Sequence, residues 1–308
     1  MPQLYTWVFE PGFFTSAQVQ VAATIGGVVA VVSTVVGVFT VMRGQSFAGH
    51  ALGDVSTAGG SGALLIGLSP LAGFVGLGVI GAGVMEMIGV RRLRGRDLAT
   101  GIVLGAAIGL SALFLYLDTT AGASTGATQQ ILFGSIFTIA SGTVPIVVIL
   151  SLVPLVSIAV ICRPLLLATV STDMAAARGV PLRLAGLLYM LALAVSVGLS
   201  SLAIGAILST ALLIGPAAAA LRLTRRVGRA VAVACVIGVG ATWLGVLLAY
   251  DSYYWGPGHQ GLPVSFFIVA VVFAAYLLSG LPDARTAARH RRPVTPMTTS
   301  PADDRVAA

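Results

Sequence analysis

The sequence predicts an all-α polytopic membrane protein with eight or nine transmembrane helices. Of its 308 residues, 57% are hydrophobic and only 9% are charged, and the mean hydropathy is +1.01. Soluble domains carry roughly 25% charged residues, so a soluble enzyme and a disordered chain are both excluded. Glycine is frequent, at 38 residues. In lipid, small residues let helix backbones pack closely, so this glycine content fits a bundle of membrane helices.

Apolar runs of the length needed to cross a bilayer, about 20 residues, recur along the chain. The nine runs cover 18–42, 48–68, 71–90, 98–117, 143–162, 184–200, 202–221, 230–250 and 263–281. The second and third runs are nearly contiguous, as are the sixth and seventh. Each of these two pairs either forms a tight hairpin of two spans or adds one span too many to the count. The shorter segment 129–141 is a re-entrant or interfacial helix, or else the start of the next span.

The basic residues give the orientation of these runs. All 17 are arginines, and every one of them follows an odd-numbered run: Arg43; Arg91, Arg92, Arg94, Arg96; Arg163, Arg178, Arg183; Arg222, Arg225, Arg226, Arg229; Arg285, Arg289, Arg291, Arg292, Arg305. Basic residues in short loops stay in the cytoplasm, which predicts an outside N-terminus and a cytoplasmic C-terminus. The net charge of +7 is therefore a topology signal, and no nucleic-acid partner is expected.

This topology divides the chain into three parts. An extracytoplasmic or interfacial segment, 1–17, precedes a membrane domain at 18–281. A tail at 282–308, rich in Pro, Arg and Thr, is expected to be disordered in the cytoplasm, near anionic lipid or a partner. The first 20 residues hold no Arg or Lys, so no cleaved secretory signal is expected.

Three ionisable residues fall inside the runs, where such residues are costly and often functional: His50, Asp54 and Glu86. His50 and Asp54 are four residues apart and share a helix face. An imidazole and a carboxylate together suit a divalent cation such as Zn²⁺ or Mn²⁺, although two ligands do not close a site. Alternatively, Asp54 only orients His50, or both lie in a wet helix entry near Arg43. Hydropathy places His50 near the cytoplasmic end of its run.

Other polar or reactive residues receive simpler interpretations. Glu86 precedes Arg91 by about one turn, which predicts a paired charge at the cytoplasmic boundary. Cys162 and Cys235 lie in or beside apolar runs without metal-ligand spacing, so we expect small core residues.

The loop between the fifth and sixth runs predicts a short helix with its own start and stop signals, at about 172–180. Ser171 or Thr172 can act as the N-cap, and Asp173 complements the helix N-terminus. An alanine-rich stretch follows, and Gly179 then Pro181 end the helix. A slim cytoplasmic helix of this kind suits docking to a partner, and the alternative is an ordinary capped loop helix.

A proline interrupts the seventh run. Pro216 should kink this helix or free a backbone carbonyl, either for packing or for lining a pathway. No P-loop, Gly-rich nucleotide fingerprint or HExxH motif occurs, so this chain is expected to be no enzyme and to hydrolyse no ATP.

Taken together, the residues from about Val21 to Leu278 resemble the zinc/manganese permease family, the membrane subunits of bacterial ATP-binding-cassette importers with a type II importer fold. Four stretches carry the resemblance: 37–54, 96–103, 173–180 and 211–220. Members of the family usually read Gly-Asp-Ala-x-x-His in the first stretch, and both the Asp and the His contribute to the metal pathway. Here His50 and Asp54 occupy these positions in exchanged order.

The resemblance implies roles for the residues and partners for the chain. His50 and Asp54 would contact the transported metal, Mn²⁺ or Zn²⁺, with Fe²⁺ as a further candidate, and no covalent cofactor is expected. The capped helix would be the coupling helix that seats on the ATPase, with these residues at matching positions: Asp173, Ala175, Ala177, Arg178 and Gly179.

The implied assembly is a homodimer in the bacterial cytoplasmic membrane. A separate ATPase subunit would use ATP, and an extracytoplasmic binding protein would deliver the metal. The exchanged His50 and Asp54 keep open a permease of the same architecture for a metal chelate or another small solute. A secondary transporter is a third alternative, which the scarcity of ionisable residues inside the runs disfavours.

Overall fold

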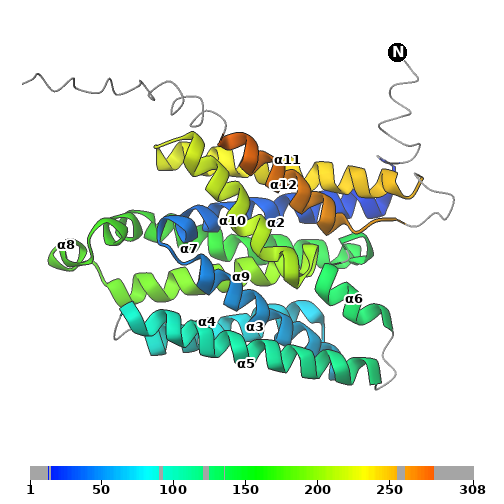
Figure 1. The fold of residues 1–308 in the computed structure, drawn as a ribbon, viewed down its shortest axis with the longest axis horizontal. Helices are drawn as coiled ribbons and strands as arrows, with labels where there is room; N and C mark the ends of the chain where they lie inside the picture. Colours follow the sequence, from blue (N-terminus) through cyan, green and yellow to red (C-terminus); the bar gives the residue numbers. More distant parts are fainter. Residues whose placement is uncertain are drawn as a thin grey trace, which may run out of the picture.

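The computed structural model describes residues 13, 15–89, 93–120, 125–134, 136–254 and 261–280. The expectations for 1–12, for Arg91 and Arg92, and for the tail at 282–308 lie outside this part of the chain. Within it, the regular elements are α-helices and short 3₁₀ turns, with no strand. The long helices run broadly along the longest axis of the molecule (Figure 1).

Each of the nine predicted runs coincides with one helix of the described residues. These helices are α2 (Ala17–Met42), α3 (Ser46–Leu65), α4 (Pro70–Gly89), α5 (Leu93–Thr120), α7 (Val144–Val170), α9 (Leu182–Ile204), α10 (Ala206–Leu223), α11 (Val227–Ser252) and α12 (Val264–Ser279). Seven segments of the described chain are long and apolar enough to cross a membrane, whereas α3, rich in Gly and Ser, and α12, with 16 residues, fall short. The all-helical membrane fold is thus confirmed, and the number of crossings stays a prediction.

The segment 129–141 does not extend the following span. It splits into the end of α6 (Thr125–Phe133) and the 3₁₀ turn η1 (Ile136–Thr138), and only the turn η2 (Ser141–Thr143) leads directly into α7. The short helix α8 (Thr172–Ala177) connects α7 and α9. In Figure 1, α6 and α8 lie at opposite ends of the bundle.

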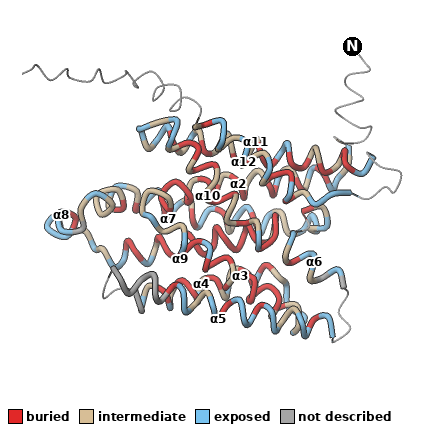
Figure 2. Tube along the Cα trace, viewed as in Figure 1, coloured by how far each residue is buried: buried red, intermediate tan, exposed pale blue. Residues whose placement is uncertain are grey.

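The centre of the bundle is formed by α2 and α9, whose residues are mostly buried, while α5 lies along one edge with most of residues 100–120 exposed (Figure 2). One close approach near the α6 end involves two glycines with positive φ, Gly134 at 74° and Gly205 at 88°. A Cβ at Gly205 would collide with the backbone of Gly134 and Leu132. Glycine therefore lets the α6–η1 link pack onto the junction of α9 and α10.

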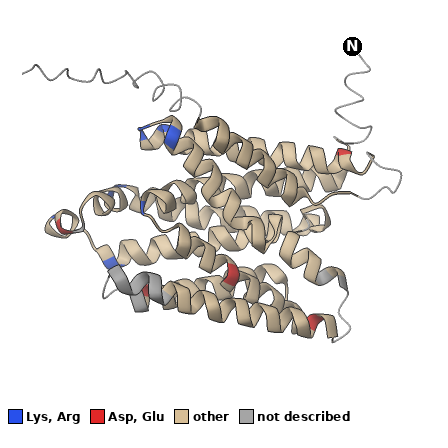
Figure 3. Ribbon diagram, in the orientation of Figure 1, with Lys and Arg blue, Asp and Glu red and all other residues tan. Residues whose placement is uncertain are grey.

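The described arginines gather toward the end of the bundle that carries α8, whereas acidic residues are spread over the molecule (Figure 3). This clustering agrees with a single basic face, as the sequence predicted. Two free cysteines, Cys162 and Cys235, are half-buried among the helices.

The helix α10 continues through Pro216, whose side chain is buried. Burial favours the packing interpretation of this proline over pathway lining. Glu86 is half-buried on α4, and a Cβ at Gly186 of α9 would lie 2.6 Å from its Oε1 atom. The carboxylate therefore lies against α9, and its predicted partner Arg91 is not among the described residues.

Candidate functional site

The second and third turns of α3 bring His50 and Asp54 onto one face. His50 Nε2 lies 3.8 Å from Asp54 Oδ2, and the two side chains are 49% and 23% exposed. This separation is close enough for one cation to touch both atoms, because metal bonds to His nitrogen and carboxylate oxygen are about 2.0–2.2 Å long. The pair thus presents two convergent ligand atoms on an open face of the chain.

A third residue, Thr210 of α10, orients the imidazole. Its Oγ1 lies 3.2 Å from His50 Nδ1. With the proton on Nδ1, His50 donates to Thr210 and keeps the Nε2 lone pair for a cation, the arrangement by which a second partner fixes the tautomer of a metal-binding His. Sequence reasoning missed Thr210, which is 160 residues from His50, and a polar residue in the α10 run was the only available signal.

The His50–Asp54 pair lies farther from the α8 end of the bundle than hydropathy predicted. A Cβ at Gly53 would lie 3.6 Å from Val197 Cγ1. Val197 follows the first residue of α9, Leu182, by 15 positions, which corresponds to about 22 Å along a helix. The hydrocarbon core is about 30 Å thick, so this level is remote from the α8 end. Hydropathy failed because it does not report that α2 ends level with Tyr189, seven residues into α9, as the Arg43 guanidinium over the Tyr189 ring shows.

The described residues supply no further acidic or imidazole ligand near this pair. No group of three or more His, Cys, Asp or Glu side chains in the described chain could hold a metal ion. Ser111 of α5 donates to the backbone carbonyl of Asp54 at 3.2 Å, which fixes α3 to α5 beside the carboxylate. The described part of the chain therefore offers two candidate ligands at this place, too few to close a metal site.

The helix α8 has the caps that the sequence predicted. Ser171 is the N-cap, and its Oγ accepts a hydrogen bond from the Met174 N–H at 3.2 Å. At the other end Gly179 has φ of 73°, and its N–H donates to the Ala176 carbonyl at 2.9 Å. Ala175 is fully buried against the chain. Of the other residues in the predicted docking set, these are exposed: Asp173, Ala177, Arg178 and Gly179.

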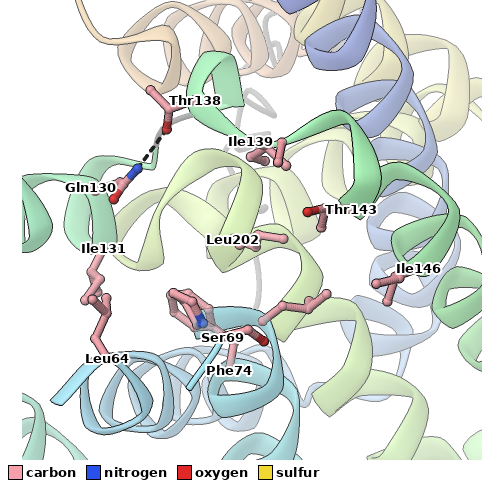
Figure 4. A pocket seen from close by; sticks show the side chains of 13 residues that line it. Leu64, Ser69, Phe74, Gln130, Ile131, Thr138, Ile139, Thr143, Ile146 and Leu202 are labelled. Carbon is pink, nitrogen blue, oxygen red and sulfur yellow. Dashed lines mark hydrogen bonds between the residues drawn. The ribbon is translucent and has the colours of Figure 1, made fainter. Parts of the chain in front are cut away.

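A cavity of about 260 Å³ lies at the opposite end, near α6. Its lining residues come from the end of α3, the start of α4 and the turn between them, and from α6, the 3₁₀ turns, α7 and α9. Gln130 donates to Thr138 across the edge of the cavity at 2.7 Å (Figure 4). No ionisable side chain is among the described residues that line it. This cavity lacks the ligand chemistry of the His50–Asp54 pair.

Comparison with known proteins identifies the bundle as a whole. A model of the ABC 3 transport family matches residues 16–279. The chain is 30% identical over 235 residues to the manganese transport system membrane protein MntC of Halalkalibacterium halodurans, covering 75% of this chain and 79% of that protein. It is also 30% identical over 280 residues to the chelated iron transport system membrane protein YfeC of Yersinia pestis, covering 89% and 90%.

The fold is similar to that of a solved structure. PsaBC from Streptococcus pneumoniae, in complex with Fab, matches with a TM-score of 0.75 and 23% identity, covering 91% of this chain and 95% of that chain. The family match extends from the residue before α2 to the last residue of α12. The chain therefore belongs to the ABC 3 transport family and is the membrane permease subunit of an ABC transporter.

Proposed function

We propose that this permease imports a divalent transition-metal ion, Mn²⁺ or Zn²⁺ with Fe²⁺ as a further candidate, across the bacterial cytoplasmic membrane. This proposal rests mainly on the convergence of His50 Nε2 and Asp54 Oδ2, which lie 3.8 Å apart and well away from the α8 end of the bundle. Imidazole plus carboxylate is a donor set that suits these metals. The names of the relatives, which include manganese transport proteins, support the same substrate class.

The small number of candidate ligands in the described part of the chain supports a homodimer with the pathway between its two copies. Each copy would contribute one His50–Asp54 pair, and two pairs give four protein ligands. Because His50 is half exposed in the single chain, it is accessible to such a shared site. Lipid would cover the outer faces of the bundle.

Energy would come from separate ATPase subunits docked on α8, since the chain carries no nucleotide-binding motif. The docking surface would consist of the α8 segment, about 172–180, and its exposed residues. An extracytoplasmic binding protein would deliver the metal to the opposite face. Closure of the ATPases would then move α8 and switch the access of the metal pair between the two sides.

Metal content of cells tests this function directly. Cells lacking the gene, starved in turn of Mn, Zn and Fe, should show a deficit in one metal by elemental analysis. A strain carrying His50→Ala and Asp54→Ala should show the same deficit, with the variant protein present at normal level in the membrane. Normal metal content in the double variant would contradict the assignment of the pair.

A second candidate substrate is a metal chelate. The similarity to a protein of a chelated iron transport system favours it, together with the exchanged order of His50 and Asp54. A chelate supplies its own metal ligands, so uptake of the chelated metal would survive loss of the pair. Uptake of free and chelated iron, compared in the same double variant, separates the two substrates.

A further inference from the structure

The geometry points to Tyr189 as a positioning residue that couples α8 to the His50–Asp54 pair, an inference that rests on the proposed function. Tyr189 lies on α9, seven positions after the first residue, Leu182. It is fully buried. A buried Tyr hydroxyl needs a hydrogen-bond partner, and here that partner belongs to another helix.

The contacts of Tyr189 fix the turn between α2 and α3. Its hydroxyl donates to Thr40 Oγ1 at 2.9 Å, and Thr40 itself donates to the Val36 carbonyl at 2.9 Å. The Arg43 guanidinium lies over the Tyr189 ring, with Cζ 4.9 Å from the centroid. One side chain of α9 therefore holds both the last turn of α2 and the residue that ends it.

Beyond Tyr189, side chains on the same face of α9 lie against α3 next to the His50–Asp54 pair. Leu193 and Val197 are one and two turns beyond Tyr189. A Cβ at Gly49 would lie 3.8 Å from Leu193 Cδ1, and a Cβ at Gly53 would lie 3.6 Å from Val197 Cγ1. These two glycines directly precede His50 and Asp54 in the chain. The α9 side chains therefore pack, together with Ser209 and Leu213 of α10, against the backbone positions that carry the pair, and a shift of α9 would be passed to α3 there.

The connection between α8 and α9 is also short. The link between α8 and α9 is the four residues 178–181, and both of its ends are hydrogen-bonded: the Val180 N–H to the Ala175 carbonyl at 3.1 Å and the Ala185 N–H to the Pro181 carbonyl at 3.0 Å. A capped helix joined to α9 by so short a link moves with it. Displacement of α8 by an ATPase would thus reach Tyr189, then the α2–α3 turn and the first turns of α3.

The test removes only the Tyr189 hydroxyl. Tyr189→Phe is reconstituted with its ATPase in proteoliposomes, and Mn²⁺ uptake per ATP hydrolysed, the Mn²⁺ dissociation constant and the melting temperature are measured. We expect the uptake ratio to fall by about threefold or more, because one hydrogen bond of the coupling is lost, while Mn²⁺ affinity changes by less than about twofold. Tyr116→Phe on the exposed face of α5 is the matched control and should leave the ratio unchanged.

The partner hydroxyl supplies an independent check. Thr40→Val should reproduce the defect and Thr40→Ser should restore coupling, and the double variant Tyr189→Phe/Thr40→Val should be no worse than either single variant. If uptake and ATP hydrolysis fall in proportion together with the melting temperature, Tyr189 is merely structural and the inference is wrong. An unchanged ratio also overturns it.

A readout without substrate separates this inference from the proposed function. In a background with both native cysteines replaced, Phe47→Cys places a thiol at the exposed start of α3. ATP should change its labelling rate when Tyr189 is present, and Tyr189→Phe should abolish that change. A wild-type protein that takes up none of Mn²⁺, Zn²⁺ and Fe²⁺ refutes the proposed metal, whereas an ATP response that persists in Tyr189→Phe refutes only the coupling role.

Discussion

At the scale of single residues, Thr210 should determine how well His50 binds the proposed metal. Thr210→Val removes the hydroxyl that His50 Nδ1 contacts at 3.2 Å and keeps the shape of the side chain. We expect Mn²⁺ binding to weaken by about tenfold, the effect typical of losing the partner that orients a metal-binding His. Isothermal titration of the purified permease measures this.

The neighbouring residue gives a control for that prediction. Ser209 also carries a buried hydroxyl, but it donates to the Ala206 carbonyl within its own helix at 2.9 Å. Ser209→Ala should therefore leave Mn²⁺ affinity unchanged, and Thr210→Ser should retain it. Equal weakening in the Ser209 and Thr210 variants would mean that general packing, rather than His50 orientation, sets the affinity.

Residue-scale prediction from the sequence succeeded where the pattern is local. His50 and Asp54 are one helical turn apart, so spacing alone placed them on one face. Thr210 and Tyr189 escaped notice because their partners, His50 and Thr40, are 160 and 149 residues away in the chain. A single sequence carries no signal for contacts of that separation between apolar helices.

At the scale of elements, the shape of α8 depends on Gly179. Its φ of 73° and its N–H bond to the Ala176 carbonyl are both incompatible with proline. Gly179→Pro should therefore distort the end of α8 and remove docking, so that neither ATPase stimulation nor transport remains in proteoliposomes. If the Gly179→Pro variant stimulated the ATPase and transported at normal rates, α8 would be ruled out as the docking element.

The turn between α3 and α4 offers a matched control for this substitution. Gly67 has φ of 74°, and its N–H donates to the Leu64 carbonyl at 3.0 Å. Leu64 lines the cavity near α6, at the end of the bundle remote from α8. Gly67→Pro imposes the same backbone change there, so it should leave stimulation of the ATPase intact.

Local signals predicted most elements well, and tertiary packing explains the exceptions. The caps of α8 were predictable because Ser171 and Gly179 act within a few residues. The course of α6 was left open between a separate helix and the start of the next span, because it depends on the backbone contact of Gly134 with Gly205 across the bundle. The depth of α3 was misjudged for the same reason, since it is set by packing against α4, α5, α9 and α10, which lie elsewhere in the chain.

At the scale of the whole molecule, the arginine-bearing end should face the cytoplasm. The described arginines gather toward the α8 end, and short basic loops remain on the cytoplasmic side of bacterial membranes (Figure 3). Two exposed positions at opposite ends test this: Met174 on α8 and Thr120 at the end of α5. Each is replaced by cysteine, as Met174→Cys or Thr120→Cys, in a protein whose Cys162 and Cys235 have been changed to alanine.

A membrane-impermeant maleimide should label the Thr120→Cys variant in intact spheroplasts and the Met174→Cys variant only after permeabilisation. The positions differ in side because α5 runs away from the basic loop before it, whereas α8 lies within the basic segment between Arg163 and Arg183. Labelling of Met174→Cys in intact spheroplasts would mean that the true topology is the reverse of the predicted one. In the reversed topology α8 would be out of reach of any cytoplasmic ATPase, so the same result would also contradict the proposed coupling through α8.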